Sequence, residues 1–424
     1  MSQSKESVHP HAAGLRASTE VLTRGFDPRL SVGSARPAVF RSSTYVFSSP
    51  EAAERAFSVA SGKSKAAEGE NVELIYARLN HPNAEIVEDQ MVPLETGAQE
   101  AAVFNSGMAA IMTAMTTFAG PGDSVVYTVP VYGGTQHLIH EFLEPFGLKG
   151  IPVPAGNMRR LEEAIAGAAN LRIVFIETPA NPTLRMTSIK KAAEVAHARH
   201  KANGAAPPLV MVDNTFLGPV FQHPLLHGAD LVLYSATKYL SGFSDLLAGA
   251  ALARDVALIQ MMKARRVIFG NILPPDECWM LDGRLPTVAL RMNRASKNAQ
   301  RIAEHLKSHP RIERVWYPSL FTDPEQTAIR NEQCDYPGAL VSLDLKGGKA
   351  AAFDFLRHLR IARNAVSLGG VETLACHPMT TTHSPLSEAE LAEAEIGEGL
   401  VRLSVGTEDW RDLLADFEQA LGKL

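Results

Sequence analysis

The fold of this chain is decided by Ser235-Ala236-Thr237-Lys238, a polar stretch that follows the apolar run Leu231–Tyr234. A similar run, Leu209–Asp213, comes earlier and ends inside Val212-Asp213-Asn214-Thr215. Both runs are short and apolar and are bounded by polar residues, which is typical of buried strands. In open α/β sheets, groups at the carboxyl ends of neighbouring parallel strands meet in one crevice. We therefore expect Asp213 and Lys238 to lie in the same site.

The residue types at these two strand ends match the chemistry of a pyridoxal-phosphate site. A lysine that forms a Schiff base with this cofactor needs a nearby carboxylate, which keeps the pyridine nitrogen protonated so that the ring can accept electrons. Asp213 is the candidate carboxylate, and the hydroxyls of Ser235 and Thr237 are candidates for binding the phosphate. Taken singly, an ordinary strand-end acid or a surface lysine is the better interpretation. The combination favours the cofactor site.

Several further runs resemble those of a known family, and they occur in that family's order over about residues 35 to 410. The matching runs are 76–83 (YARLNHPN), 105–110 (NSGMAA), 131–135 (VYGGT), 177–183 (ETPANPT), 212–215 (VDNT), 235–239 (SATKY), 367–370 (SLGG) and 402–406 (RLSVG). The chain resembles the pyridoxal-phosphate enzymes of Cys/Met metabolism, which include cystathionine γ-synthase, cystathionine and methionine γ-lyases, and O-acylhomoserine sulfhydrylases. Many short motifs in one fixed order are far more specific than any one of them.

The resemblance implies an α/β fold of the aspartate aminotransferase type (fold type I), with a mostly parallel central sheet and a smaller C-terminal α+β domain. Periodicity agrees, since it predicts strands at 124–127, 171–176, 209–213, 231–234 and 340–344, and helices at 107–117, 189–200, 288–309 and 410–421. We expect three parts: an N-terminal arm (1–75) that contacts a neighbouring subunit, a large cofactor-binding domain (76–287) and a small domain (288–424).

The phosphate end of the site is predicted from Ser106, Gly107 and Met108, which open a helix with a residue that leaves its amides accessible to an anion. A plain helix cap is the alternative interpretation, and it weakens once Ser235 and Thr237 are taken into account. The resemblance further implies that Tyr76 and Arg78 contact the phosphate across a subunit interface. The functional unit is then at least a dimer, and a tetramer is expected. The alternative for Arg78 is a solvated loop charge.

Four more residues receive roles from the resemblance. Tyr132 would stack on the pyridine ring, Asn181 would bind the 3′-oxygen, and Arg402, at a helix-to-strand junction, would capture the substrate α-carboxylate with Ser367 close by. A half-buried structural tyrosine and a turn asparagine are the alternatives for Tyr132 and Asn181.

The same resemblance implies a mechanism. The amine of Lys238 removes the α-proton, Asp213 keeps the ring cationic, and Tyr132 donates a proton to the group that leaves Cγ. A nucleophile can then add at Cγ (replacement), or the product is released and hydrolyses to 2-oxobutanoate and ammonia (elimination).

Substrate choice depends on positions outside this shared machinery. Many cystathionine-processing relatives have a glutamate where this chain has Val366, and methionine γ-lyases usually have a cysteine where it has Gly134. The His81-Pro82 pair also departs from the sequence that is commoner in the family at these positions, which indicates a separate branch. We expect a γ-lyase acting on a methionine-like or O-substituted homoserine substrate such as canavanine. Cystathionine γ-synthase or O-acylhomoserine sulfhydrylase activity is the alternative, and a catalytically silent cofactor-binding relative is a remote one.

Composition narrows the class of protein. A net charge of −5 over 424 residues argues against a nucleic-acid partner or an anionic membrane surface. No apolar run is long enough to span a membrane, and the N-terminus lacks the apolar core of a signal peptide. The three cysteines are an odd number without CxxC spacing, which favours the reducing cytoplasm. His197 and His200 lie on a basic helix without an acidic third ligand, so no metal site is expected.

Overall fold

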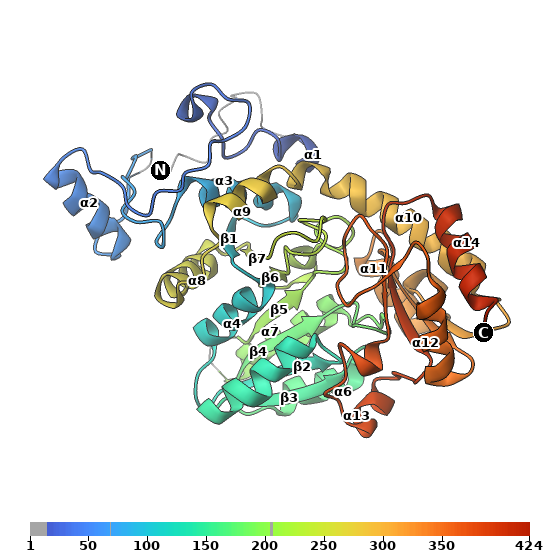
Figure 1. The fold of residues 1–424 in the computed structure, drawn as a ribbon. Helices are drawn as coiled ribbons and strands as arrows, with labels where there is room; N and C mark the ends of the chain where they lie inside the picture. Colours follow the sequence, from blue (N-terminus) through green and yellow to red (C-terminus); the bar gives the residue numbers. More distant parts are fainter. Residues whose placement is uncertain (1–14, 68, 204–206) are drawn as a thin grey trace.

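The computed structural model describes residues 15–67, 69–203 and 207–424, and this part of the chain forms two sheets with helices around them (Figure 1). The helices are α1 (Ala17–Glu20), α2 (Pro50–Ala60), α3 (Pro82–Met91), α4 (Gly107–Phe118), α5 (Gly133–His137), α6 (Met158–Gly167), α7 (Ile189–Asn203), α8 (Val256–Phe269), α9 (Pro275–Asp282), α10 (Val288–Leu306), α11 (Pro324–Gln333), α12 (Gly348–His358), α13 (Glu388–Glu393) and α14 (Trp410–Leu421). The strands are β1 (Glu100–Phe104), β2 (Ser124–Val129), β3 (Lys149–Pro154), β4 (Leu171–Glu177), β5 (Leu209–Asp213), β6 (Leu231–Tyr234), β7 (Gly249–Ala253), β8 (Ile312–Trp316), β9 (Leu340–Leu345), β10 (Arg363–Asn364), β11 (Leu374–Cys376) and β12 (Leu400–Ser404).

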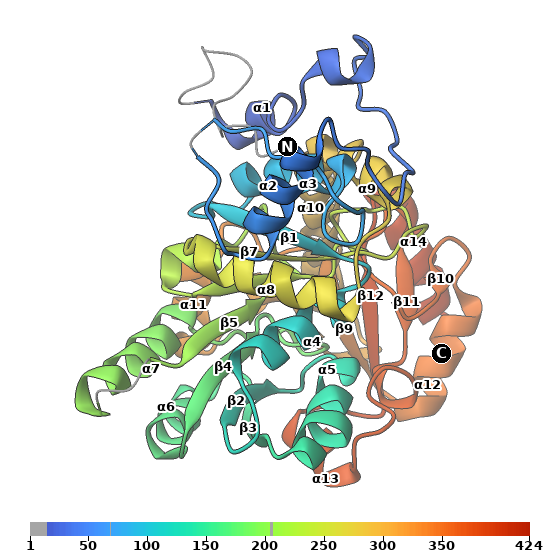
Figure 2. The same cartoon turned by 90° about the vertical axis from the view of Figure 1, so that its left-hand side faces the viewer.

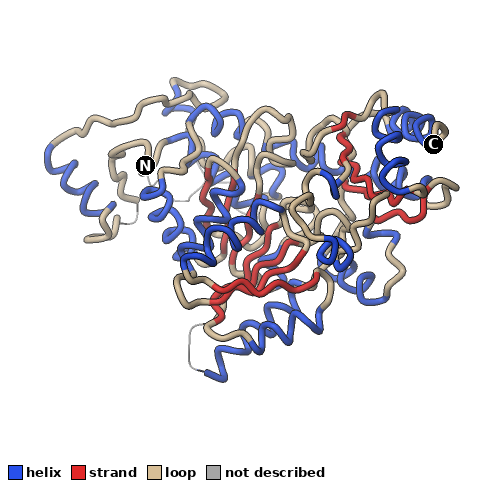
Figure 3. Tube along the Cα trace, turned by 60° about the horizontal axis from the view of Figure 1, so that its bottom comes forward, coloured by secondary structure: helices blue, strands red, loops and turns tan. Residues whose placement is uncertain are grey.

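The large sheet has the strand order β1-β7-β6-β5-β4-β2-β3. Among the described strands of this sheet, β7 pairs antiparallel with both of its neighbours, β1 and β6. The remaining pairs, from β6 through β5, β4 and β2 to β3, are parallel. The predicted mostly parallel sheet is therefore confirmed. Figure 3 shows helices on both sides of the strands, as parallel sheets require when both faces are apolar.

Alternate residues of each central strand belong to two different cores. Val210 and Val212 of β5 pack with α6 and α7, whereas Met211 packs with α4 and α8. By the same alternation along β4, Ile176 packs on the α7 side of the sheet and Phe175 packs on the α4 side. Because successive side chains of a strand point to opposite faces, the last residues of β4 and β5 both point toward α4.

The small sheet has the order β10-β11-β12-β9-β8 and is covered by α12 and α14. Its core includes Leu343 of β9 and Phe355 of α12. Helix α10 joins the two units: Met292 lies in the core of the large sheet, and Ile302 lies in that of the small sheet. The predicted second, smaller α+β unit is present, and α10 ends at Leu306, before the Pro310 that cannot continue a helix.

The N-terminal arm, described from residue 15, holds two α-helices, α1 and α2, and one short 3-10 helix (Pro28–Ser31) before α3. Figure 1 shows α2 projecting from the body on the side away from α14, and Figure 2 shows the arm beside α3 and α9. Val32, Val46 and Phe57 of the arm are exposed. Apolar side chains exposed on a projecting segment suit a protein partner. Contact of the arm with a second subunit stays a prediction.

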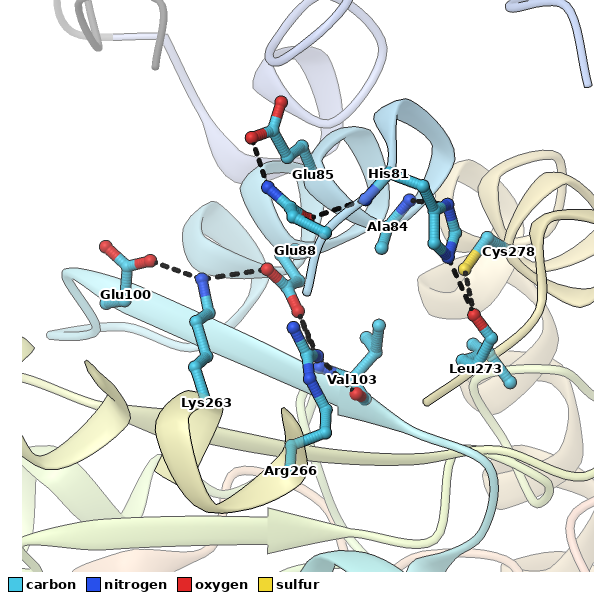
Figure 4. A network of polar contacts seen from close by, with 11 residues as sticks. His81, Ala84, Glu85, Glu88, Glu100, Val103, Lys263, Arg266, Leu273 and Cys278 are labelled. Carbon is cyan, nitrogen blue, oxygen red and sulfur yellow. Dashed lines mark hydrogen bonds and ion pairs between the residues drawn. The ribbon is translucent and has the colours of Figure 1, made fainter. Parts of the chain in front are cut away.

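A buried polar network fastens α3 to β1 and α8 (Figure 4). Glu88 of α3 accepts hydrogen bonds from Arg266 Nη1 at 2.6 Å and from the backbone N of Val103 at 2.9 Å, and Lys263 Nζ lies 2.8 Å from its second oxygen. At the start of α3, His81 accepts from Ala84 N and donates through Nε2 to the carbonyl of Leu273. The helix that follows the Tyr76–Arg78 motif is thus fixed at both its first and its second turn.

Candidate active site

A cavity of about 180 Å³ opens at the carboxyl ends of β2, β4, β5 and β6. It gathers most of the residues that the sequence singled out. These are Ser106, Gly107, Met108, Tyr132, Asn181, Asp213, Ser235, Thr237, Lys238 and Arg402, and Ser367 joins them through a hydrogen bond to Lys238. The remaining walls include Glu177, Val366, Thr382 and Leu247. The position agrees with the rule that ligands of parallel sheets bind beyond the strand ends.

Lys238 is half-buried in this cavity, and its Nζ donates to Ser367 Oγ at 3.0 Å. Burial, with the nearby Arg402 guanidinium, lowers the pKa of the Lys238 ammonium below its ordinary value. Both effects disfavour the charged form. A lysine with an increased share of neutral amine at neutral pH is better suited to act as a nucleophile or a base.

Two carboxyl groups lie side by side at the strand ends. Glu177 and Asp213 are register partners on β4 and β5, so their side chains point to the same face. Asp213 accepts from Thr215 N at 3.1 Å and from Thr215 Oγ1 at 2.6 Å. Burial raises the pKa of Asp213 despite these bonds, and burial together with Asp213 raises the pKa of Glu177 to about 8. The pair therefore carries less than its full negative charge unless a cation joins it.

The N-terminus of α4 forms another part of the cavity wall. Ser106 caps the helix by accepting from Ala109 N, and the amides of Gly107 and Met108 precede the first helical hydrogen bond and point outward. An added Cβ at Gly107 would lie 2.9 Å from the Cβ of Ser235, so only glycine allows this close approach. Thr237 lies in the wall, but its hydroxyl donates to the carbonyl of Ala248 and accepts from the Ala248 amide.

Arg402 is almost fully buried in the wall that faces the small sheet. It donates through Nη1 to Asn181 Oδ1 at 3.0 Å and through Nη2 to the carbonyls of Val366 and Ser367. Its Nε is buried and has no acceptor among the described residues. Arg402 lies in the middle of β12, not at the helix-to-strand junction that the sequence indicated, because β12 begins two residues earlier at Leu400.

The comparisons with known proteins agree with this geometry. The sequence profile of the family described as Cys/Met metabolism PLP-dependent enzyme matches residues 18–422. The chain is 37% identical over 405 residues to an L-methionine gamma-lyase of Pseudomonas deceptionensis, covering 95% of this chain and 96% of that protein. It is 34% identical over 404 residues to an O-succinylhomoserine sulfhydrylase of Pseudomonas aeruginosa, covering 95% of each. A solved cystathionine gamma synthase from Xanthomonas oryzae pv. oryzae superposes with a TM-score of 0.86 at 32% identity, covering 97% of this chain and 99% of that chain.

The chain belongs to this family. It is therefore a pyridoxal-phosphate-dependent enzyme, and the predicted cofactor and the fold-type-I architecture are confirmed. The predicted reaction class, elimination or replacement at Cγ, is the one that the names of these lyase and synthase relatives describe. Canavanine as a substrate stays a prediction.

The residues of this family member fit the cofactor. A helix N-terminus, with the hydroxyl of Ser235 beside it, suits a phosphate, and Asp213 suits a protonated ring nitrogen. Lys238 lies in the same cavity as both. The individual residue roles stay predictions.

Tyr76 and Arg78 do not line the cavity with the others. Tyr76 is 42% exposed, and Arg78 donates to the carbonyl of Val267 at 2.7 Å on the α8 side. None of the described residues that line the cavity belongs to the segment before α3. This position is compatible with the expected contribution to a neighbouring subunit, and it gives these two residues no role in the site of their own chain.

Two residues at or beside the site received no individual role from the sequence, although the loop from His377 to His383 is a candidate for recognising the substrate tail. Glu177 opens a run that was recognised, but the prediction used only its Asn181. His383 donates through Nε2 to the carbonyl of Asn181 at 3.0 Å. Burial, followed by Arg402, lowers the pKa of His383 to about 4, so this imidazole is neutral at neutral pH. A polar residue at the end of a buried strand was the available signal for Glu177, whereas His383 had no local signal.

No helix of the described residues has both the length and the apolar character needed to cross a membrane.

Proposed function

We propose that this enzyme is a γ-lyase that acts on a methionine-like or O-substituted homoserine amino acid. One observation carries the proposal: the amine of Lys238, the carboxylate of Asp213 and the buried guanidinium of Arg402 face one cavity whose remaining distal wall is largely apolar. That set can hold a cofactor, receive an amino acid by its carboxylate and take its α-proton. The alternative is γ-replacement, as in the sulfhydrylase and synthase relatives.

Each end of the cofactor has a candidate partner. Asp213 would hold the ring nitrogen, the amides of Gly107 and Met108 with Ser235 would hold the phosphate, and Tyr132 would cover the ring. When bound, the cofactor withdraws electrons from Cα of the amino acid and so makes its α-proton acidic. Thr215 orients Asp213, because its Oγ1 donates to Asp213 Oδ1 at 2.6 Å and itself accepts from Ser235 N at 2.8 Å.

Lys238 is the proposed base. Its Nζ would take the α-proton, and the hydrogen bond to Ser367 Oγ holds the amine on the side of the cavity where Arg402 lies. Arg402, which lines the cavity, would bind the α-carboxylate through its guanidinium and so fix the Cα–H bond toward Lys238. The hydroxyl of Tyr132 would donate a proton to the group that leaves Cγ.

The distal wall favours a tail without an ammonium group. Val366 is 54% exposed and lines the cavity together with Leu247 and Phe216. Such a wall offers no carboxylate at this position to a cationic tail. An added Cβ at Gly134 would lie 2.8 Å from Cε1 of Tyr132 and 2.9 Å from Sδ of Met108, so this tyrosine orientation requires glycine there. The cysteine common at that position in methionine γ-lyases would displace the ring.

A substrate panel tests the proposal. The holoenzyme is incubated with methionine, homocysteine, cystathionine, O-acylhomoserines and canavanine, with and without a thiol nucleophile, and the products are identified by mass spectrometry. We expect 2-oxobutanoate and ammonia from a methionine-like or O-substituted substrate. Products in which the thiol has replaced the γ-group, in excess over 2-oxobutanoate, would support the sulfhydrylase or synthase alternative instead.

We also propose that the site is completed by a second copy of the chain, in at least a dimer and with a tetramer as the expected assembly. Arg78 and Tyr76 lie at the α8 end, beside the exposed apolar residues Ile268 and Phe269. Co-expressing an Arg78→Ala chain with a Lys238→Ala chain should restore some activity, because a hybrid dimer contains one site with both native residues. A hybrid that is isolated by two affinity tags and is inactive would contradict the shared site.

The proposed location is the cytoplasm. Its support is the state of the cysteines, since Cys278, Cys334 and Cys376 are all free. Fractionation of cells that produce the protein, followed by detection with an antibody, would test it.

A further inference from the structure

Glu177 ties together two loops that both contribute to the cavity wall. Its Oε2 accepts from the backbone N of Tyr132 at 2.9 Å, and its Oε1 accepts from the backbone N of Asn181 at 3.3 Å. Tyr132 follows β2, and Asn181 follows β4. One buried side chain therefore uses both of its oxygens on backbone groups of two different loops, and none of the mechanistic roles above requires it.

The two loops carry the groups that matter for binding. The Tyr132 ring lies in the cavity, and the Asn181 side chain accepts a hydrogen bond from Arg402. The carbonyl of Asn181 accepts in turn from His383. A shift of the Asn181 backbone would therefore move a partner of the guanidinium that is proposed to bind substrate. Positional errors of this kind are costly in catalysis even when they are small.

We propose that Glu177 is a positioning residue, which sets the distance between the Tyr132 and Asn181 walls and responds to whether a cation is bound at Asp213. This inference rests on the proposed function of the cavity, and it adds a link between the ring-nitrogen end of the site and the walls on either side of the ring.

The link is electrostatic. Glu177 is buried, and the charged groups that act on it are Asp213 of β5 and Arg402 of β12, while Lys238 lines the same cavity. Burial and the Asp213 carboxylate raise the pKa of Glu177 above the ordinary value of a carboxyl group, whereas the Arg402 guanidinium lowers it. A protonated ring nitrogen against Asp213 would offset the charge of that carboxylate and so lower the proton affinity of Glu177.

Loss of that proton strengthens the two backbone hydrogen bonds, because an ionised carboxylate is a stronger acceptor than a carboxylic acid. Binding of the ring at Asp213 therefore tightens the loops at Tyr132 and Asn181.

A purely structural carboxylate in the same chain provides the matched control. Asp416 of α14 is also buried and accepts three backbone hydrogen bonds, from the N atoms of Arg360, Ile361 and Ala362. It lies in the small unit and outside the cavity wall. The substitutions Glu177→Gln and Asp416→Asn both exchange a carboxylate for an amide of the same size, and the amide presents N–H to one of the backbone donors.

The experiment measures binding of pyridoxine 5′-phosphate, which has the ring and phosphate but no aldehyde, so the amine of Lys238 forms no bond with it. We expect Glu177→Gln to bind about tenfold more weakly and with a different pH dependence, and Asp416→Asn to lose thermal stability while binding within about twofold of the parent. Equal affinity and equal pH dependence of Glu177→Gln and the parent would overturn the inference.

A measurement on the unmodified chain covers the case in which Glu177→Gln does not fold. Difference infrared spectroscopy should show the C=O stretch of one protonated carboxyl group disappearing when pyridoxine 5′-phosphate binds near pH 7. Binding without loss of that band overturns the inference, whereas the proposed function survives. If the unmodified protein does not bind pyridoxine 5′-phosphate at all, the cavity is not the ring site and the proposed function fails with it.

Discussion

Glu88 and Glu177 are both buried glutamates, and the fold treats their charges in opposite ways. Glu88 lies between Lys263 and Arg266, as Figure 4 shows, and although burial opposes its charge, these cations lower the pKa of Glu88 to about 2. Glu177 lies beside a second carboxylate, Asp213. Burial, followed by that neighbour, raises the pKa of Glu177 to about 8. Side chains of the chain itself neutralise the charge of Glu88, whereas the charge of the Glu177–Asp213 pair is left for a bound cation to neutralise.

The difference separates structural carboxylates from those of a site. A buried ion pair whose donors are all within the chain needs nothing further, so Glu88 holds α3 against α8 whether or not a ligand is present. Two adjacent buried carboxylates are unfavourable by themselves and persist where function requires them. The contrast between the Glu88 network and the Glu177–Asp213 pair is therefore a test of which residues serve stability and which serve chemistry.

The largest difference should be between two half-buried lysines, Lys238 of the cavity and Lys263 of the Glu88 network. Lys238→Ala should lower turnover by more than ~10⁴-fold, because it removes both the covalent partner of the cofactor and the base. Lys263→Ala, in the Glu88 network, should reduce stability and leave turnover per folded site within about threefold. Borohydride reduction of the holoenzyme followed by peptide mapping should label Lys238. A label on Lys263 or any other lysine would refute the assignment.

Asp213→Asn should lower turnover by about 10³-fold while the chain remains folded. A neutral amide cannot keep the ring nitrogen protonated, yet its oxygen still accepts from Thr215, as the carboxylate does at 2.6 Å. Removal of the neighbouring charge should also relieve Glu177. Steady-state kinetics and thermal unfolding of the apoenzyme measure the two effects. Turnover within about tenfold of the parent, a barrier change of only ~1.4 kcal/mol, would argue against the role of Asp213.

Glu88→Gln should show the reverse, a loss of stability of about 3 kcal/mol with little loss of activity per folded site. The pKa of Glu88 is lowered in the folded state from its ordinary 4.5 to about 2. Its stabilising contribution is therefore complete above about pH 4.5 and disappears as the pH falls through about 2, because the unfolded chain then takes up the proton first. Denaturant unfolding at several pH values should show that this acid-dependent loss is absent in Glu88→Gln.

For Glu177, the same experiment should show the opposite change of the unfolding free energy with pH. Its folded pKa is raised to about 8, so between about pH 4.5 and 8 the folded apoenzyme keeps a proton that the unfolded chain has lost. This group makes the apoenzyme less stable as the pH rises through that window. Glu177→Gln should flatten the decline, and a variant that declines as steeply as the parent would contradict the raised proton affinity.

The sequence predicted the parts of the site that depend on local signals. Asp213 and Lys238 each follow a short apolar strand, so their position at the sheet edge follows from strand polarity alone. Ser106 and Gly107 are a helix start with its own pattern. Roles for Arg402 and Ser367 came from the family resemblance, and the structure brings both into the site.

The residues that were missed depend on contacts between distant segments. Glu177 matters because β4 pairs with β5 in a register that sets Glu177 opposite Asp213, and alternation of apolar residues does not reveal which strands are neighbours. His383 comes from an irregular segment after β11 that folds back onto Asn181. The Thr237 hydroxyl is hydrogen-bonded to the backbone of Ala248, just before β7, so its predicted phosphate contact requires a rearrangement that no local pattern indicates.

The smallest effect should come from the distal wall. A carboxylate introduced there is paired by a substrate with a distal ammonium and left unpaired by a substrate without one. Val366→Glu introduces a carboxylate beside the cavity at a position that is 54% exposed, so water keeps it ionised and the cost to stability is small. It should raise turnover of cystathionine relative to methionine by about tenfold, because a distal ammonium gains a partner. Val366→Gln keeps the size without the charge and should leave that ratio within about twofold.

The ratio is measured from kcat/KM for both substrates at low and high salt, since an ionic contribution at a half-exposed position weakens with screening. If the unmodified enzyme already prefers cystathionine to methionine, O-acylhomoserines and canavanine, the apolar distal wall does not set its specificity, and the cystathionine-processing relatives are the better guide to its substrate.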